Sequence, residues 1–198
     1  MLKKEKYHHG DLKAELLKNG LHLLNKEGYE GFSLRKVAAL CNVSHSAPYK
    51  HFSSKDELIA TITADVSESF ISTLAEVMKN PSTDPKSQII EVGLQYIKFL
   101  IEHPDYFKFI FLTNHHNPIL MTEDTFITRD GHPFQMIQKC MADFLSSVGM
   151  EKKNWVAETL SVWGLVHGLV VLHIHNTIAY TGDYMELAEK LLRERLAE

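Results

Sequence analysis

The sequence predicts an all-α protein of roughly nine helices, because apolar residues recur at helical spacing along most of the chain. The longest run places an apolar side chain at every fourth position, at Leu58, Ile62, Val66, Phe70, Leu74 and Met78. No alternating apolar and polar run competes as a β-strand. Two short helical patterns joined by a tight turn lie near the N-terminus. They predict that the chain has two domains, a three-helix helix-turn-helix head at residues 1–58 and a C-terminal helical domain at residues 59–198.

The composition is that of an ordinary globular protein, with 44% hydrophobic and 23% charged residues in 198 positions. The net charge of −4 is unevenly distributed. Lys and Arg outnumber Asp and Glu by 3 through Ala60, whereas Asp and Glu outnumber Lys and Arg by 7 from Thr61 onward. This asymmetry favours an N-terminal module that meets phosphates and an acidic remainder that does not.

The cysteines and the apolar stretches indicate a cytoplasmic protein without a membrane partner. Cys41 and Cys140 are the two cysteines, and both lie in apolar helical patterns typical of reduced core residues. Residues 1–4 lead into charged residues, so we expect no signal peptide. The most apolar stretch, Trp163–Leu172, is too short to span a bilayer.

The chain begins with a basic segment, Met1–His9, which predicts a solvated arm able to meet phosphates. A leucine-rich helix follows from Gly10, and Gly28 is expected to end it as a C-terminal cap. Gly20 lies inside that helix, where it indicates close approach of another helix.

The next segment predicts a helix, a tight turn and a second, very short helix. Ser33 precedes an apolar periodic run and is a good N-cap. Asn42 tolerates the left-handed conformation that a tight turn needs. Ser44 is then expected to cap a short helix ending at His51. Its outward residues are small, polar or hydrogen-bonding, as a helix in a DNA major groove requires: His45, Ser46, Ala47, Tyr49 and Lys50.

A capping box, in which Ser54 caps and Glu57 reaches back, predicts the start of the long helix, which ends near Lys79. Asn80–Pro85 then forms the clearest linker. The remaining apolar periodicity predicts helices at 86–102, 105–112, 133–148, 156–178 and 184–196, with a long loop at 114–132.

The stretch VSHSAPYKHFSSK resembles the helix-turn-helix of TetR-family transcriptional regulators. The residues that match the family pattern in order and spacing are Val43, Ser44, Tyr49, His51, Phe52 and Lys55. The resemblance covers residues 11–58. Asn42 departs from the usual glycine, which is a mild change because Asn suits the same backbone conformation.

The resemblance implies that residues 44–51 enter the major groove of double-stranded operator DNA. Ser33 and Arg35 lie at a helix N-terminus, which favours a phosphate, and Arg35 is the best candidate for guanine recognition, with a solvated charge as the alternative. Lys55 would contact a phosphate. The predicted DNA-binding residues are Ser33, Arg35, Ser44, His45, Ser46, Ala47, Tyr49, Lys50, His51 and Lys55.

A second motif, Trp163-x-x-x-His167-Gly168, resembles the C-terminal ligand-binding domain of one TetR subgroup. Trp163 and His167 lie one turn apart on a helix, and Gly168 allows another helix to approach. The candidate ligand-binding residues are Phe99, His103, Tyr106, Ile110, Phe134, Ile137, Met141, Trp163 and His167. The alternative is that these residues simply pack the core.

These features predict a repressor that a small-molecule effector of unknown identity releases from a palindromic operator. A homodimer formed through the last two helices would place two heads about 34–36 Å apart. No cofactor and no metal are expected, because His115-His116 and His173/His175 lack metal-ligand spacing on a helix. The sequence has no nucleophile elbow, phosphate loop or HExxH motif, so we expect no enzyme. The alternatives are a helical protein-binding adaptor and a metal-responsive regulator that uses His clusters.

Overall fold

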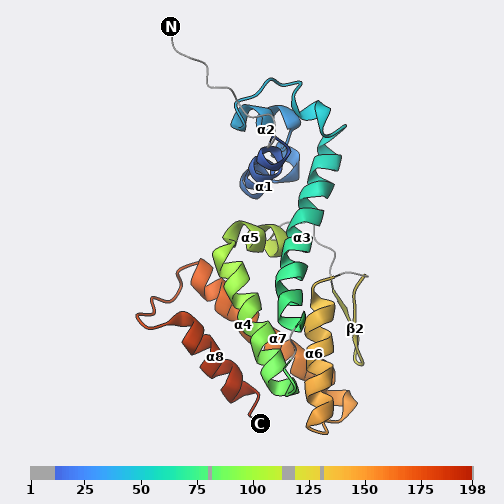
Figure 1. Ribbon diagram of the computed structural model, residues 1–198, viewed down its shortest axis with the longest axis vertical. Coiled ribbons are helices and arrows are strands. Elements are labelled where there is room, and N and C mark those ends of the chain that lie inside the picture. Colours follow the sequence, from blue (N-terminus) through green and yellow to red (C-terminus); the bar gives the residue numbers. More distant parts are fainter. Residues whose placement is uncertain (1–11, 80–81, 113–118, 130–131, 198) are drawn as a thin grey trace. The chain divides into compact units, whose positions relative to one another are not determined.

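The computed structural model describes residues 12–79, 82–112, 119–129 and 132–197 (Figure 1). The predicted basic arm at Met1–His9, the linker residues Asn80 and Pro81, and His115-His116 lie outside the described residues. The chain divides into two compact units. The N-terminal unit is residues 1–66 with 108–115, and the C-terminal unit is residues 67–107 with 116–198.

The N-terminal unit contains α1 (Leu12–Gly31), α2 (Leu34–Leu40), a 3₁₀ helix (Pro48–Lys50) and the first part of α3 (Lys55–Lys79). Gly28 interrupts α1 with φ 69°, so the regular helix ends there as the sequence predicted. A Cβ added at Gly20 would lie 2.8 Å from Cδ1 of Ile62, which confirms the close approach of α1 and α3. The core of this unit includes the buried side chains Leu16, Leu24, Val37, Phe52 and Leu58.

The second, very short helix expected at residues 44–51 is present, but only as the 3₁₀ helix Pro48–Lys50. The segment folds as a turn followed by the 3₁₀ helix, and its backbone hydrogen bonds join Ala47 N to Ser44 O and His51 N to Pro48 O. Pro48 has no N–H to donate to the Ser44 carbonyl, so an α-helical bond cannot form at this position. The shorter 3₁₀ pattern remains.

The N-terminus of α3 differs from the predicted capping box by one residue. Ser54 Oγ accepts a hydrogen bond from Glu57 N at 3.1 Å, as predicted. Glu57, however, accepts from the backbone N–H and the hydroxyl of Ser53, at 2.6 and 2.5 Å, instead of returning to Ser54. These bonds hold the pKa of Glu57 below its usual range. The start of α3 is therefore well defined.

The C-terminal unit is a helical bundle in which α4 (Pro85–Glu102) packs against three other helices, α6 (Phe134–Ser147), α7 (Trp155–Ile174) and α8 (Tyr184–Arg195). Figure 1 shows α4 between α8 and α6. α5 (Pro104–Leu112) follows α4, and a 3₁₀ helix at Lys152–Asn154 precedes α7. Asp84 caps α4 by accepting from Lys86 N and Ser87 N. The all-α prediction is confirmed.

Two predicted details of this unit are wrong. The segment expected to be a loop contains a small antiparallel hairpin, β1 (Leu120–Met121) with β2 (Phe126–Ile127), in which Leu120 pairs with Ile127. Gln138 on α6 donates to the Phe126 carbonyl at 3.3 Å and ties the hairpin to the bundle. α7 ends at Ile174 instead of Ile178, because Asn176 takes φ 50° and turns the chain.

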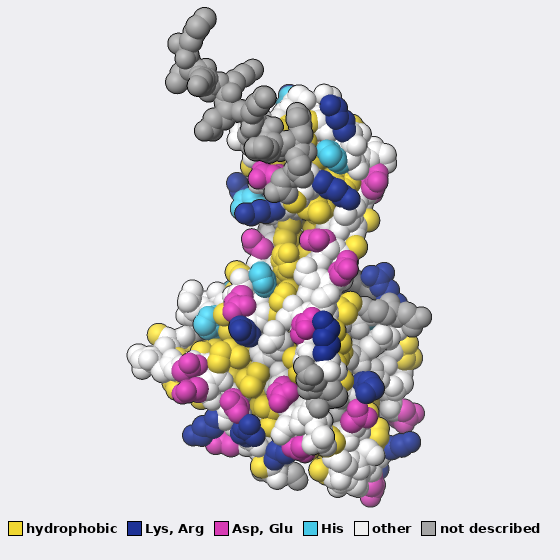
Figure 2. Space-filling model, in the orientation of Figure 1, with side chains coloured by type: hydrophobic (Ala, Val, Ile, Leu, Met, Phe, Trp, Pro, Cys, Tyr) yellow, Lys and Arg dark blue, Asp and Glu magenta, His cyan; other side chains and the backbone are white. Residues whose placement is uncertain are grey.

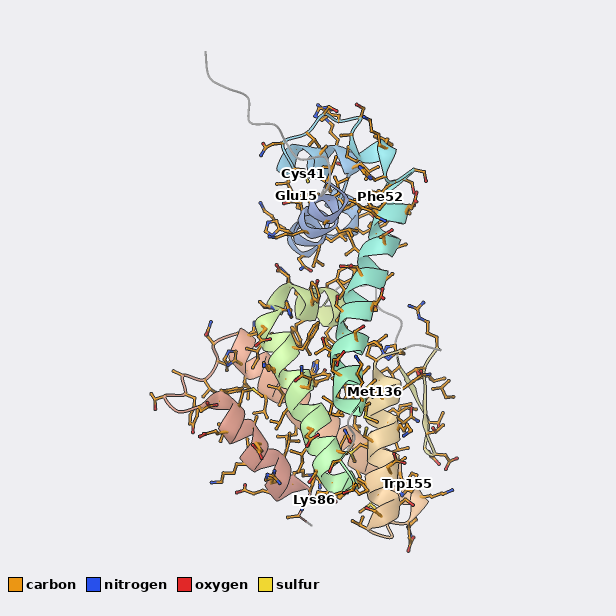
Figure 3. All side chains as sticks on the ribbon, viewed as in Figure 1. Glu15, Cys41, Phe52, Lys86, Met136 and Trp155 are labelled. Atoms are coloured by element: carbon orange, nitrogen blue, oxygen red, sulfur yellow. The ribbon has the colours of Figure 1, made fainter. Side chains whose placement is uncertain are left out.

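Both cysteines are buried, as the sequence predicted, and they do not form a disulfide with each other. Cys41 accepts a hydrogen bond from Asn19 Nδ2 at 3.4 Å, and burial raises the pKa of its thiol. Figure 3 shows Cys41 near Glu15 of α1, whose carbonyl lies 3.6 Å from the Cys41 sulfur. Cys140 lies 3.7 Å from Met78 Sδ, and burial raises its pKa as well.

By length and hydropathy alone, α3 and residues Lys152–Ile174 would each be able to cross a membrane. The same test is met by core helices of soluble proteins, so it is weak support for a membrane segment. Both helices contribute buried side chains to the units described above, including Val66, Phe70, Val166 and Val170.

Candidate nucleic-acid interface and effector domain

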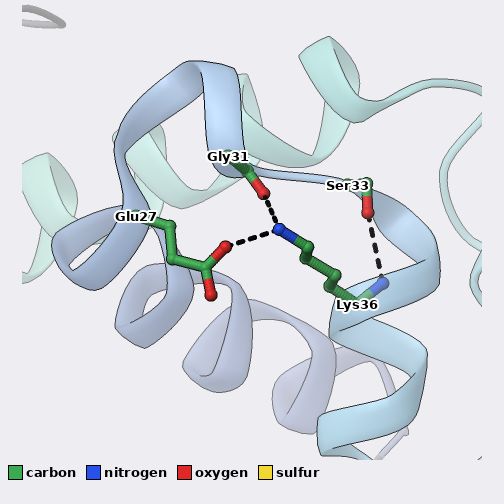
Figure 4. A network of polar contacts seen from close by, with 4 residues as sticks. All are labelled: Glu27, Gly31, Ser33 and Lys36. Atoms are coloured by element: carbon green, nitrogen blue, oxygen red, sulfur yellow. Dashed lines mark hydrogen bonds and ion pairs between the residues drawn. The ribbon is translucent and has the colours of Figure 1, made fainter.

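The corner between α1 and α2 is fastened by Lys36 (Figure 4). Its Nζ donates to Glu27 Oε2 at 2.6 Å and to the Gly31 carbonyl at 2.8 Å, and its backbone N–H donates to Ser33 Oγ at 3.3 Å. Lys36 also holds the pKa of Glu27 below its usual range. Ser33 is thus the N-cap that the sequence predicted, whereas Arg35 extends into solvent from the same turn of α2.

The turn after α2 is a Schellman motif. Val43 N donates to the Ala38 carbonyl and Asn42 N to the Ala39 carbonyl, at 3.0 and 3.1 Å. Asn42 has φ 54°, the left-handed conformation predicted for it. The turn satisfies the last carbonyls of α2 and directs the chain into the candidate recognition segment, residues 44–51.

The candidate recognition segment is held by two buried side chains and exposes most of the others. Pro48 and Phe52 are buried, and Ala47 is half-buried. Ser44 and Ser46 lie with their hydroxyl oxygens 3.1 Å apart, and Tyr49 is 61% exposed. The side chains that face solvent are those predicted to contact DNA: Ser44, His45, Ser46, Tyr49, Lys50 and His51.

Lys55, the last predicted DNA-binding residue, begins α3 and lies on an aromatic ring. Its Nζ is 3.9 Å from the centroid of the Tyr29 ring, and Tyr29 Oη donates to Asp56 Oδ1 at 2.7 Å. This bond raises the pKa of Tyr29. Sequence reasoning missed Tyr29, because helical periodicity gives no sign of a pairing between the end of α1 and the start of α3.

The surface of the N-terminal unit carries charges of both signs. Figure 2 shows Lys, Arg and His side chains interspersed with Asp and Glu on this part of the molecule. Among the described residues, the Lys and Arg side chains predicted for the site are Arg35, Lys50 and Lys55. Affinity for DNA would depend on where these cations lie more than on net charge.

The centre of the C-terminal unit holds a chain of hydrogen bonds between three aromatic side chains. Trp163 Nε1 donates to Tyr96 Oη at 3.4 Å, and Tyr96 Oη lies 2.9 Å from His167 Nδ1. Tyr96 is only 1% exposed, and burial raises its pKa strongly. Burial also lowers the pKa of His167, so the neutral imidazole is favoured.

The predicted ligand-binding residues fall into two groups. Phe134, Trp163 and His167 lie together, with ring centroids 4.9 Å apart for Phe134–Trp163 and 5.8 Å for Trp163–His167. Ile137 and Met141 are buried on α6. Phe99, His103 and Tyr106 form a second group, in which the exposed His103 stacks on Tyr106 at 5.1 Å and packs on Phe99 at 4.7 Å.

Three residues that the sequence analysis left out complete the first group. Phe70 packs on Tyr96 and Phe99 at 5.4 and 5.1 Å, and Phe107 lies 5.4 Å from His167. Phe70, Tyr96 and Phe107 all follow the apolar periodicity of their helices, which marks them as core but does not reveal the hydrogen bonds. Ile110 belongs to the N-terminal unit and is half-buried there.

α7 carries a stripe of small and apolar residues that the described part of the chain leaves uncovered. Leu160 is 40% exposed, and Ala157 and Gly164 are exposed beside it. A Cβ added at Gly164 or Gly168 would meet no atom of the described chain within 4 Å. The close helix approach predicted at Gly168 therefore does not occur within the described part of this chain.

α8 covers the other side of α7 and joins it by polar contacts. Arg195 forms an ion pair with Glu158 at 2.5 Å and donates from Nε to Ser161 Oγ at 3.1 Å. Tyr184 Oη donates to the Leu169 carbonyl at 2.7 Å. The two helices are thus fastened to each other while the stripe on α7 stays exposed.

Within the described residues, no group of three or more His, Cys, Asp or Glu side chains is placed to hold a metal ion. His173 packs on the ring of Tyr184 at 4.7 Å, and His175 is exposed. His115 and His116 lie outside the described residues.

A curated relative and three solved structures resemble this chain. The relative is an uncharacterized HTH-type transcriptional regulator, YerO, from Bacillus subtilis (strain 168), which is 26% identical over 108 residues. The match takes in 52% of this chain and only 36% of YerO. A protein of unknown function from Rhodococcus sp. RHA1 has a TM-score of 0.71 and 18% identity, covering 98% of both chains.

The other two solved structures are ligand complexes. The regulator FadR from Bacillus subtilis, in complex with stearoyl-CoA, has a TM-score of 0.67 and 13% identity, covering 93% of this chain and 97% of its own. AibR, in complex with isovaleryl coenzyme A and operator DNA, has a TM-score of 0.63 and 16% identity, covering 92% and 96%. At these identities the likeness concerns the fold.

Two family profiles match the chain directly. The profile for bacterial regulatory proteins of the tetR family matches residues 16–62, which contain both helices of the motif and the start of α3. The profile for the tetracyclin repressor-like C-terminal domain matches residues 89–194, more than half of the chain, including Trp163, His167 and Gly168. The chain therefore belongs to the TetR family of DNA-binding transcriptional regulators.

Proposed function

We propose that this TetR-family regulator is a repressor that binds a palindromic operator as a homodimer and leaves it when a small molecule binds. The observation that carries the proposal is the exposure of the candidate recognition segment. Six of its side chains with hydrogen-bonding groups face solvent, while Pro48 and Phe52 anchor it. We assign DNA binding to residues 1–58 and effector binding and dimerisation to residues 59–198.

In this proposal the recognition segment reads base edges with His45, Ser46 and Ala47. Tyr49, Lys50 and His51 contact phosphates or the groove wall, and Lys55 contacts a phosphate. Arg35, exposed on α2, is the candidate for bidentate hydrogen bonds to guanine. Phosphate contacts would fix the register of the head, and base contacts would carry the sequence preference.

The dimer is proposed to form through α7 and α8. The exposed stripe on α7 supports this choice, because Gly164 and Gly168 leave room for a helix of a second copy. Two-fold symmetry would bring the same stripe from each copy together. Two heads are needed because one short segment reads too few base pairs for useful affinity.

The effector is proposed to be a small molecule with an apolar part, and acyl-CoA thioesters, whose acyl chain is apolar, are the first class to test. Two structures of similar fold are complexes with stearoyl-CoA and isovaleryl coenzyme A. The aromatic group around Tyr96, Trp163 and His167 supports an effector with an apolar part, since these polar side chains hydrogen-bond to one another among apolar rings.

We further propose that the protein acts in the cytoplasm, where a bacterial regulator meets chromosomal DNA, and that it catalyses no reaction. A metal-responsive regulator is the weaker alternative, because the described residues contain no group suited to a metal ion. A protein-binding adaptor would not need the polar, exposed recognition segment.

The decisive experiment is selection of the purified dimer against random duplex DNA, followed by sequencing of the bound pool. A two-fold symmetric consensus is expected. Tyr49→Ala and Lys50→Ala should each weaken binding to the selected duplex, whereas the matched controls Tyr180→Ala and Lys139→Ala, exposed in the C-terminal unit, should not. A folded dimer that enriches no sequence at low salt would overturn the proposal.

The effector is tested on the same duplex. Isovaleryl-CoA and stearoyl-CoA are each added to the complex, with free coenzyme A as the control, and release is followed by fluorescence anisotropy. Trp155→Phe leaves Trp163 as the single tryptophan, so its emission reports binding in the effector domain directly. If neither thioester releases the duplex or changes the Trp163 emission, this class of effector is rejected.

A further inference from the structure

We propose that Tyr29 is a positioning residue for DNA binding, which holds the Lys55 ammonium ready for a phosphate oxygen. The inference rests on the proposed contact between Lys55 and DNA. It adds a residue from the end of α1 that lies outside the recognition segment and that has no DNA contact of its own in the proposed function.

The geometry couples the two residues directly. Lys55 Nζ lies 3.9 Å from the centre of the Tyr29 ring, well inside the range of about 6 Å at which an ammonium is attracted to an aromatic face. None of the ion pairs among the described residues includes Lys55. Within the described part of the chain, the ring thus contacts the Lys55 ammonium without a competing ion pair.

Tyr29 is itself held at both ends. Its hydroxyl donates to Asp56, the residue next to Lys55, at 2.7 Å. The segment that carries the ring is fastened by Lys36, which binds Glu27 and the Gly31 carbonyl on either side of it (Figure 4). Gly28, with φ 69°, makes the turn that brings Tyr29 out of α1. The ring is thus a fixed platform.

A fixed platform matters because a lysine side chain is flexible and loses much rotamer freedom when it binds a phosphate. That entropy cost falls when the ammonium is already confined. An ammonium has three N–H donors, and a ring on one side leaves donors on the other side available. Lys55 can therefore keep its contact with the ring while it donates to a phosphate oxygen.

The test measures binding of a fluorescent duplex of mixed sequence at several salt concentrations. The same variants are then measured on the selected operator. Because phosphate contacts do not depend on sequence, the mixed duplex reports them alone. The variants are Lys55→Met, Tyr29→Leu, Tyr29→Phe and the double variant. Lys152→Met is the matched control, since Lys152 also lies over a ring, that of Trp155, but in the C-terminal unit.

Lys55→Met is expected to weaken binding and to lower the slope of log K against log salt by about one per head. Tyr29→Leu should weaken binding by about two- to fivefold, the size of an exposed cation–π contact. In the Lys55→Met background, Tyr29→Leu should have no further effect. Tyr29→Phe, which keeps the ring, should retain most of the affinity, and Lys152→Met should change neither affinity nor slope.

The outcomes separate the two proposals. No loss with Lys55→Met would remove the phosphate contact and, with it, the basis of this inference. A loss with Lys55→Met but none with Tyr29→Leu would leave the proposed function standing and overturn the role of Tyr29. Equal losses from Tyr29→Leu in both backgrounds would show a structural role only.

A second measurement does not depend on whether Tyr29→Leu folds. In the NMR spectrum of the unaltered protein, the ring current of Tyr29 should move the Lys55 εCH₂ protons upfield of those of Lys50, which is exposed. Lys55 protons at the same position as those of Lys50 would overturn the proposed platform.

Discussion

Tyr96 and His167, 71 residues apart in sequence, are joined by a contact of 2.9 Å between Tyr96 Oη and His167 Nδ1. Trp163 Nε1 can only donate, so its contact with Tyr96 Oη makes the tyrosine oxygen an acceptor there. Tyr96 Oη and His167 Nδ1 share the second hydrogen bond, whose donor depends on which ring nitrogen of His167 carries the proton.

Tyr96→Phe tests this chain of hydrogen bonds. The substitution keeps the ring packed on Phe70 but removes the oxygen that Trp163 and His167 share. We expect the free energy of unfolding to fall by about 1–3 kcal/mol, the cost of leaving buried polar groups without a partner. Urea denaturation of both proteins measures the difference. An unchanged midpoint would show that the contacts add nothing to stability.

The lowered pKa of His167 predicts a loss of stability in acid. A group whose pKa is lower in the folded state contributes stability above its unfolded pKa, near 6.5, and loses it as the pH falls toward the folded value. The free energy of unfolding should therefore decrease from about pH 7 downward. His167→Gln should flatten the profile.

His132 provides the comparison for that pH profile. Burial also lowers its pKa, so it contributes a loss of the same sign. His132→Gln should remove the share of the acid-induced loss of stability that is due to His132 and leave the share that is due to His167. If His167→Gln left the acid limb unchanged, the titrating group would have to be sought elsewhere.

Gly168→Leu is expected to separate dimerisation from folding. A Cβ at Gly168 meets no described atom within 4 Å, so the monomer can accept a larger side chain, whereas a second copy packed on the stripe cannot. We expect the dimer dissociation constant to rise at least tenfold, by analytical ultracentrifugation, with little change in monomer helicity.

The matched control is Gly93→Leu. At that position a Cβ would lie 3.1 Å from Leu192 and 3.4 Å from Val166, so the substitution should damage the fold of the monomer. If Gly168→Leu leaves the dimer dissociation constant unchanged, the dimer interface does not include this stripe.

Position 42 should accept glycine better than a β-branched residue. Its φ of 54° costs an ordinary L-residue about 1–2 kcal/mol, which glycine does not pay and asparagine partly avoids. Asn42→Gly should leave the thermal midpoint unchanged or raise it, whereas Asn42→Val should lower it. Calorimetry of the three proteins gives the order, and a Val variant as stable as Asn42 would contradict the assigned turn.

Local sequence signals predicted much of the fold. Helical periodicity identified the main helices, and Ser33, Asn42 and Gly28 marked their ends because capping and left-handed turns depend on a few neighbouring residues. The same reasoning overestimated the length of the short helix expected at residues 44–51, because Pro48 has no backbone N–H to donate. It also missed the hairpin at residues 120–127, whose two-residue strands are too short to show alternation.

The site was predicted less completely than the fold. Residues of the candidate recognition segment follow one another, so one motif was enough to predict them as a group. Tyr29 and Lys55 are distant in sequence, as are Tyr96 and His167, and single-sequence periodicity contains no information on which helix faces meet. Exposure of Tyr49 and burial of Phe134 likewise depend on packing that only the folded chain establishes.

The burial of both native thiols has a practical consequence for spectroscopy. Cys41 and Cys140 are the two cysteines of the chain, and burial raises the pKa of each, so little reactive thiolate is present at neutral pH. A cysteine introduced at an exposed position such as Ser46 would be the preferred site for a spin label without removal of the native ones. In a homodimer it would supply one label per head, and pulsed dipolar measurements could then follow the separation of the heads as effector is added.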